Sequence, residues 1–343
     1  MVKTIFTLLV FASAGLAQSS SDETSSMPYS EDVNFSLGLS QLVGAEIFRS
    51  EGGALASGVV RPEPVSLPII RAEAQEVNLT FTVTNHHGHF VRNLAPSDFT
   101  IHDNGELPER VTYFESQSEL PLRLAIVIDS SASVAYAFND EKQSAAVFLK
   151  RILRRDSDLA LVMGFNQEVR LVQEPANDTR LLSHAIRKLR SGGETAIYDA
   201  VSAACQQLAK VRDTQTVRRV IILITDGEDN SSHINLEQAE EVAQRNECAV
   251  YVMSINLATD RNLEQSDRAM KELSAATGGN FLPAARTEEG LAIAFSKIDK
   301  ELRSQYLISY KPANVRPDGS FHRLVVLGPK KLQIHHRHGY FAR

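Results

Sequence analysis

The sequence predicts an α/β fold, in which a doubly wound and mainly parallel sheet is flanked by helices, with a small β-sandwich-like module beside it. From residue 122 onward, short apolar segments alternate with helical segments, which is typical of a parallel sheet with crossover helices. Before residue 120 and after residue 305, strand segments instead follow one another with turns between them. The length of 343 residues also favours two domains over one.

The N-terminus has the features of a cleaved signal peptide, residues 1–17. Lys3 supplies a positive charge, residues 4–16 are apolar, and small residues close the segment before Gln18. The apolar run is too short to span a membrane, and no Cys follows it for a lipid anchor. We therefore expect a secreted or periplasmic protein. Residues 18–68 begin with a Ser- and acid-rich stretch and are expected to form a disordered or poorly ordered lead-in.

Strand segments lie on both sides of the α/β region, in residues 69–120 and 306–343. Residues 77–84 alternate apolar and polar side chains, as a half-buried strand does. Residues 103–105, Asp-Asn-Gly, give a hairpin signal. The further strands are expected at 99–102, 111–114, 306–310, 321–327 and 332–335. Because the C-terminal strands are too few to be stable alone, we expect them to pair with the N-terminal strands in one β module.

Residues 121–305 are expected to form the α/β domain. Residues 122–128 are almost continuously apolar, as expected for a strand that is buried on both faces. The other strands are expected at 159–165, 169–172, 220–224, 249–255 and 280–283. The helices are expected at 138–153, 179–189, 196–210, 235–246, 266–276 and 287–304.

Composition narrows the classes of function. A hydrophobic content of 43% suits a chain with a substantial core, and a formal net charge of −6 argues against nucleic-acid binding, which needs a basic face. Cys205 and Cys248 are the two cysteines. An exported chain permits a disulfide between them, but their apolar surroundings equally suit two buried thiols.

The first strand of the α/β domain ends in a D-x-S-x-S pattern formed by Asp129, Ser131 and Ser133. Ligands of an open α/β sheet bind beyond the carboxyl ends of its strands. One carboxylate and two hydroxyls in a tight turn are hard oxygen donors that suit Mg²⁺ or Ca²⁺. By itself the pattern is weak, because serine-rich turns also cap helices.

Thr195, before a predicted helix, and Asp226, after the strand at 220–224, should lie at the same edge of the sheet. With them, residues 122–304 resemble the von Willebrand factor A domain family, which has a Rossmann-like doubly wound fold. The metal-ion-dependent adhesion site of that family consists of D-x-S-x-S, then a Thr, then an Asp. The matching residues are Asp129, Ser131, Ser133, Thr195 and Asp226.

The resemblance implies how such a site works. Ser131 and Ser133 would bind Mg²⁺, or Ca²⁺ or Mn²⁺ in its place, directly, and Thr195 directly or through water. Asp129 and Asp226 would act largely through water and hydrogen bonds. The metal would then accept an acidic side chain of a protein partner. Exposed charges near the site, at Glu194, Glu228 and Asp229, are candidates for partner specificity, although solvated loop charges explain each of them as well.

The flanking segments resemble those of exported bacterial proteins with a von Willebrand factor A-like core. We therefore expect an exported, metal-dependent protein-binding module for adhesion or interaction, and not an enzyme. Two alternatives stay open: a metal-dependent hydrolase at the same edge, and a structural protein with a vestigial site. Two histidine clusters, at 86–89 and 335–338, are weaker metal candidates, because successive strand residues face opposite ways.

Overall fold

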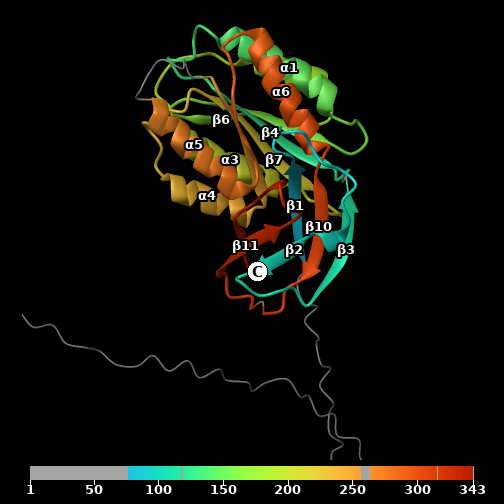
Figure 1. The fold of residues 1–343 in the computed structure, drawn as a ribbon. Helices are drawn as coiled ribbons and strands as arrows, with labels where there is room; N and C mark the ends of the chain where they lie inside the picture. Colours follow the sequence, from blue (N-terminus) through green and yellow to red (C-terminus); the bar gives the residue numbers. More distant parts are fainter. Residues whose placement is uncertain (1–75, 117–118, 256–262, 315, 343) are drawn as a thin grey trace, which may run out of the picture. The chain divides into compact units, whose positions relative to one another are not determined.

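A six-stranded sheet of order β6-β5-β4-β7-β8-β9 forms the centre of the α/β domain (Figure 1). Its strands are β4 (Leu122–Asp129), β5 (Leu159–Phe165), β6 (Val169–Ala176), β7 (Arg218–Thr225), β8 (Cys248–Ser254) and β9 (Phe281–Pro283). All neighbours are parallel except β6, which runs antiparallel to β5. Every residue of β4 is buried, as the continuous apolar run predicts. The fold class expected from the sequence is confirmed.

Helices cover both faces of this sheet (Figure 1). They are α1 (Phe138–Ile152), α2 (Thr179–Lys188), α3 (Ile197–Ala209), α4 (Leu236–Arg245), α5 (Leu263–Thr277) and α6 (Glu288–Leu302). One core contains side chains of α1, α2 and α6, and the other contains side chains of α3, α4 and α5. Alternate β4 residues serve the two cores, since Ile126 packs in the first and Val127 in the second.

Strands from both ends of the described chain build the β module. One sheet has the order β12-β1-β10-β3 and the other β13-β11-β2, and both contribute to a single core that includes Phe81 and Tyr306. The strands are β1 (Val77–Thr84), β2 (Thr100–Asp103), β3 (Arg110–Ser116), β10 (Tyr306–Lys311), β11 (Phe321–Leu327), β12 (Gln333–His336) and β13 (Gly339–Phe341). Since β1 pairs with β10 and β12, the expected flanking module from N- and C-terminal strands is confirmed.

The hairpin predicted at residues 103–105 forms only in part. The tight turn forms, with Asn104 and Gly105 at positive φ and a bridge between Asp103 and Glu106. The strands beside it nevertheless separate, because β2 pairs with β11 while β3 pairs with β10. A turn type is set locally, whereas the partner of a strand depends on which segments share its core.

The computed structural model describes residues 76–342 except 117–118, 256–262 and 315. The expected signal peptide and lead-in lie outside the described residues. Within them, Cys205 and Cys248 are free thiols, both buried in the core that contains side chains of α3, α4 and α5. Among the helices in this part of the chain, none is long and apolar enough to cross a membrane.

Candidate metal site at the carboxyl edge of the sheet

Asp129, the last residue of β4, is fully buried and held at both carboxylate oxygens. Its Oδ1 accepts a hydrogen bond from the backbone N–H of Ser131 (2.8 Å), and its Oδ2 accepts one from the Thr225 hydroxyl at the end of β7 (2.7 Å). The second bond joins two adjacent parallel strands at their carboxyl ends. The orientation of Asp129 is therefore set by the protein.

Two hydroxyls lie next to each other in the turn that follows. The Ser131 and Ser133 oxygens are 3.0 Å apart, and the Ser133 side chain is also hydrogen-bonded to Asp226. Ser131 is buried, whereas Ser133 is exposed. The turn thus places two adjacent hydroxyl oxygens, one buried and one on an exposed residue, beside a carboxylate that follows another strand.

The loop before α3 is tied to this turn through its glycines. The N–H of Gly192 donates to the carbonyl of Ser130 (2.7 Å), and the N–H of Ala132 donates to the carbonyl of Gly193 (3.0 Å). Gly192 and Gly193 have φ values of 144° and 94°, a region that side chains with a Cβ rarely adopt. The double glycine therefore permits the backbone conformation in which this loop bonds to the turn.

Thr195 continues from that loop and is 3% exposed. Its N–H donates to the Asn230 side-chain oxygen (2.9 Å), and its carbonyl accepts from the N–H of Asn230 (3.0 Å). Asn230 belongs to the loop that begins at Asp226. These bonds bring the loops of all five expected ligands, Asp129, Ser131, Ser133, Thr195 and Asp226, to one edge of the sheet.

Asp226 is buried, and its Oδ1 has no hydrogen-bond partner. Burial raises the pKa of Asp226, although the hydrogen bond with Ser133 opposes the rise. Burial also raises the pKa of Asp129 to about 6, against hydrogen bonds that lower it. Burying a carboxylate oxygen without a hydrogen-bond partner is costly, so Oδ1 of Asp226 is open to a further cation or donor.

A third carboxyl group, Glu141 of α1, was not predicted from the sequence. It is completely buried, and neither of its oxygens has a hydrogen-bond partner. Its pKa is raised to about 9, chiefly by burial and also by the charges of Asp129 and Asp226. A signal was present, because Glu141 lies four residues before Ala145 on the apolar side of the helix.

Arg286, between β9 and α6, places a cation near these carboxyl groups. Its guanidinium lies 3.9 Å from Asp226 Oδ2, contacts the Ile255 carbonyl, and stacks on the exposed Tyr136 ring at 4.6 Å. The sequence reasoning missed Arg286 as well, since nothing local connects it to the site. Among the described residues, Arg286 is the one positive charge at ion-pair distance from Asp226.

These donors fit a divalent cation. Two hydroxyls and an orphaned carboxylate oxygen are hard oxygen ligands, and burial raises the pKa values of the carboxyl groups beside them. No three His, Cys, Asp or Glu side chains in the described ranges are grouped to hold a metal by themselves. A metal at this edge therefore depends on the serine and threonine hydroxyls.

The three expected specificity residues have different surroundings. Glu194 and Glu228 are exposed, and the N–H of Glu194 is anchored to the Gln167 side chain (3.0 Å). Asp229 is half-buried and accepts a hydrogen bond from the N–H of Ser232 (3.2 Å). Glu194 and Glu228 are free to face a partner, whereas Asp229 partly serves its own loop.

The sheet order and the polar cluster at its carboxyl edge define an α/β ligand-binding domain whose site is made by strand-end loops. Residues 124–282 match the von Willebrand factor type A domain, and this part of the chain is such a domain. Domains of this family mediate interactions between proteins, so the chain carries a protein-interaction module.

Several known proteins are similar to this chain. An uncharacterized protein of Synechocystis sp. is 31% identical over 112 residues, which cover 32% of this chain and 26% of that protein. The chain thus matches about a quarter of the length of that relative. An aerotolerance-related membrane protein from Bacteroides fragilis, solved with multiple mutations to serines, has 16% identity and a TM-score of 0.43, covering 53% of this chain and 98% of that one.

The vWF domain of the type V pili tip protein Mfa5 from Porphyromonas gingivalis is also similar. It has 14% identity and a TM-score of 0.45, with 53% of this chain and 94% of that chain covered.

Proposed function

We propose that this chain is an exported module that binds a protein ligand through a divalent metal, Mg²⁺ with Ca²⁺ or Mn²⁺ as substitutes, at the carboxyl edge of the sheet. The observation that carries the proposal is the set of three buried carboxyl groups with raised pKa values beside two adjacent hydroxyls. A cation is the simplest group that stabilises such a cluster.

The residues have distinct tasks in this proposal. Ser131, Ser133 and Thr195 would hold the ion through their hydroxyls. Asp129 orients the turn, since both of its oxygens already accept hydrogen bonds from the protein. The bound ion would supply a positive centre that attracts an acidic side chain of the partner. Exposed Glu194 and Glu228 would repel partners with surplus negative charge around that side chain.

Binding, rather than catalysis, is part of the proposal. The Ser130 hydroxyl is buried and donates to the Phe165 carbonyl (2.8 Å), so it is occupied and screened from a substrate. The Ser131 and Ser133 hydroxyls contact each other, where a nucleophile would need a general base. These contacts support a ligand-holding role for the three serines.

The test is a thermal titration with Mg²⁺ after treatment with a chelator. A ligand at 100 times its dissociation constant stabilises the folded state by about 2.7 kcal/mol. We expect a saturable rise in Tm for the parent and for Ser320→Ala, an exposed serine of the β module. Ser133→Ala should lose most of that rise, and its Tm without metal is the baseline, because the variant also loses the contacts with Ser131 and Asp226.

If Mg²⁺ does not stabilise the parent, the proposal is wrong, and the remaining alternative is a structural protein with a vestigial metal site. Turnover of a phosphoester or peptide panel that disappears in Ser133→Ala would favour the hydrolase. Binding of an acidic peptide that requires Mg²⁺ would support the module as proposed. N-terminal sequencing of the protein from the exported fraction tests export, with Gln18 expected as the first residue.

A further inference from the structure

A second charged cluster lies at the opposite edge of the sheet from the carboxyl groups. A cavity of about 280 Å³ is found there, at the starts of β4 and β7 and the ends of α1 and α6. We call it the arginine pocket, after its charged lining of Arg92, Arg154, Arg218, Arg303, Glu119 and Asp158. Four positive and two negative side chains leave it with a net charge of +2.

Arg218, the first residue of β7, is the most deeply buried of the four arginines. It is 6% exposed, and its Nη1 donates to the Leu302 carbonyl at the end of α6 (2.6 Å). Its Nε and Nη2 are buried and have no hydrogen-bond partner. Arginine carries five N–H donors, so capping the helix uses only part of this side chain. Arg218 therefore lines the cavity with N–H groups left over, which are sealed from solvent in this structure.

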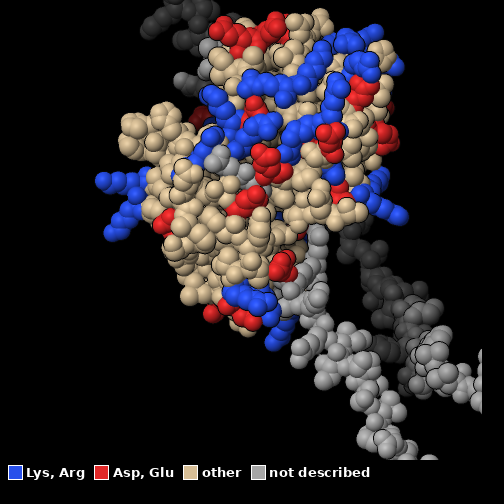
Figure 2. Space-filling view, turned by 90° about the vertical axis from the view of Figure 1, so that its right-hand side faces the viewer, with Lys and Arg blue, Asp and Glu red and all other residues tan. Residues whose placement is uncertain are grey.

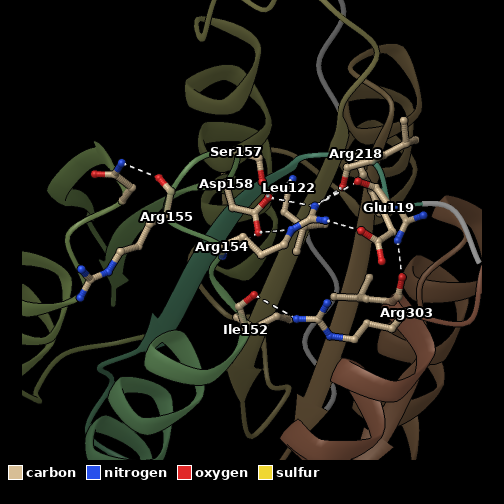
Figure 3. Close-up of polar contacts among 12 residues, drawn as sticks. Glu119, Leu122, Ile152, Arg154, Arg155, Ser157, Asp158, Arg218 and Arg303 are labelled. Atoms are coloured by element: carbon tan, nitrogen blue, oxygen red, sulfur yellow. Dashed lines mark hydrogen bonds and ion pairs between the residues drawn. The ribbon is translucent and has the colours of Figure 1, made fainter.

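The acidic residues of the pocket are engaged by one of its own arginines, Arg154. Asp158 accepts hydrogen bonds from the N–H of Leu122 (2.9 Å) and from the backbone and side chain of Arg154. Glu119 pairs with Arg154 at 3.3 Å, and its side chain is mostly exposed. Figure 3 shows the Arg154 side chain reaching toward both acids. Among the described residues, no carboxylate lies within ion-pair distance of Arg218.

The other arginines leave positive charge in the pocket. Arg92 donates to the Ser304 hydroxyl (2.9 Å), which is a neutral acceptor. Arg303 reaches back to the Ile152 carbonyl (3.3 Å), as Figure 3 shows, and pairs with Asp299. The pKa of Arg218 is lowered to about 10, chiefly by burial and also by the charge of Arg154, against opposing effects of Tyr251 and Glu301. Arg92 and Arg218 are therefore the pocket arginines without a carboxylate at ion-pair distance, among the described residues.

The protein surface carries positive charge as well. Figure 2 shows Lys and Arg side chains gathered on the upper half of the side that lies on the right in Figure 1, with Asp and Glu side chains between them. The last turns of α1 and α6 contribute Lys150, Arg151 and Lys300 to the positive charge of the domain. Such a field raises the local concentration of small anions.

We propose that the arginine pocket binds a phosphate group, either as free phosphate or as the terminal group of a small phosphorylated molecule. Guanidinium groups bind tetrahedral oxyanions through paired N–H donors, and the pocket holds two arginines, Arg92 and Arg218, that have no carboxylate at ion-pair distance among the described residues. The cavity lies just below the range of about 300–1,000 Å³ that drug-sized ligands occupy, which favours a compact anion.

The test is calorimetric titration of the full chain at constant ionic strength, with chloride as the background anion. A chelator is present throughout, so that the result does not depend on the metal proposed at the other edge. One series uses inorganic phosphate and the other uses glycerol phosphate. Saturable binding of phosphate alone assigns the free ion, and binding of both assigns a phosphorylated molecule.

Three variants locate the binding. Arg92→Gln changes an exposed side chain and should weaken phosphate binding about tenfold while the protein folds normally. Arg218→Met, which keeps an apolar stem, should abolish binding. Arg155→Gln is the matched control, because Figure 3 shows this neighbouring arginine pointing away from the pocket. The proposal is overturned if neither phosphate compound binds the parent, or if all three variants bind as the parent does.

Discussion

The Arg286 guanidinium lies 3.9 Å from the Asp226 carboxylate, at the edge of the sheet where the candidate metal ligands meet. It approaches from the connection between β9 and α6 and stacks on Tyr136. A fixed cation and a divalent ion near one carboxylate repel each other. Arg286 thus links the start of the last helix of the domain to the occupancy of the proposed site.

Replacing Arg286 with Gln is expected to raise the affinity for Mg²⁺ roughly fivefold, because a nearby positive charge is removed. Calorimetric titration with Mg²⁺ at low ionic strength measures the change. Arg187→Gln, on the exposed side of α2, makes the same charge change away from the site and should leave the affinity unaltered. Equal or weaker binding by the Arg286 variant would contradict the inferred repulsion.

Glu141→Gln is expected to stabilise the metal-free protein, and increasingly so as the pH rises. The pKa of Glu141 is about 9 in the folded state against an ordinary value of 4.5, so the folded state holds a proton that the unfolded state releases. Stability is therefore lost as the pH rises from about 4.5 toward 9, by roughly 1.4 kcal/mol per pH unit at most. Glutamine, which carries no ionisable group, removes this dependence.

The measurement is urea denaturation of both proteins at pH values between 5 and 9 in the presence of a chelator. Asp140→Asn, an exposed acid one residue earlier in the same helix, serves as the control and should show a parallel pH profile to the parent. A constant difference between parent and Glu141→Gln across this range would show that Glu141 does not carry the buried proton.

Thr225→Val is expected to cost about 1–3 kcal/mol in the free energy of unfolding. The Thr225 hydroxyl donates to Asp129 and accepts from the N–H of Gly227 (3.0 Å), and valine leaves both groups without a partner in a buried place. Thr225→Ser keeps the hydroxyl and should recover most of the loss. Guanidinium denaturation compares the three proteins, and similar losses for both variants would assign the effect to packing instead.

Tyr340→Phe is expected to destabilise the β module by about 1–2 kcal/mol. Asp103 accepts hydrogen bonds from Tyr340 (2.7 Å) and Tyr310 (2.9 Å), and its other oxygen contacts His322 (2.7 Å). This buried group joins β2 to three C-terminal strands. Tyr113→Phe, at a tyrosine that is 49% exposed, is the control and should change stability by less than about 0.5 kcal/mol. The two variants are compared by thermal and chemical denaturation.

The sequence by itself determined the order of strands and helices. It also determined which residues lie at the carboxyl edge of the sheet. Leu122 to Ile128 is apolar without interruption, and strand burial follows directly from that local pattern. Asp129, Thr195 and Asp226 could be assigned to one edge, because parallel strands bring their carboxyl ends together. Strand burial and the edge at which each strand ends can therefore be predicted from local periodicity and chain direction.

Only the tertiary structure decided which residues, far apart in the sequence, are buried next to one another. Asp103 and Tyr340 are far apart in the chain, and the turn after β2 predicted a hairpin where the two strands instead join different sheets. The pairing of Glu141 with the acidic cluster, and the unpartnered nitrogens of Arg218, likewise depend on segments that meet only after folding. Burial and electrostatic potential are sums over such neighbours, and therefore local sequence patterns do not contain them.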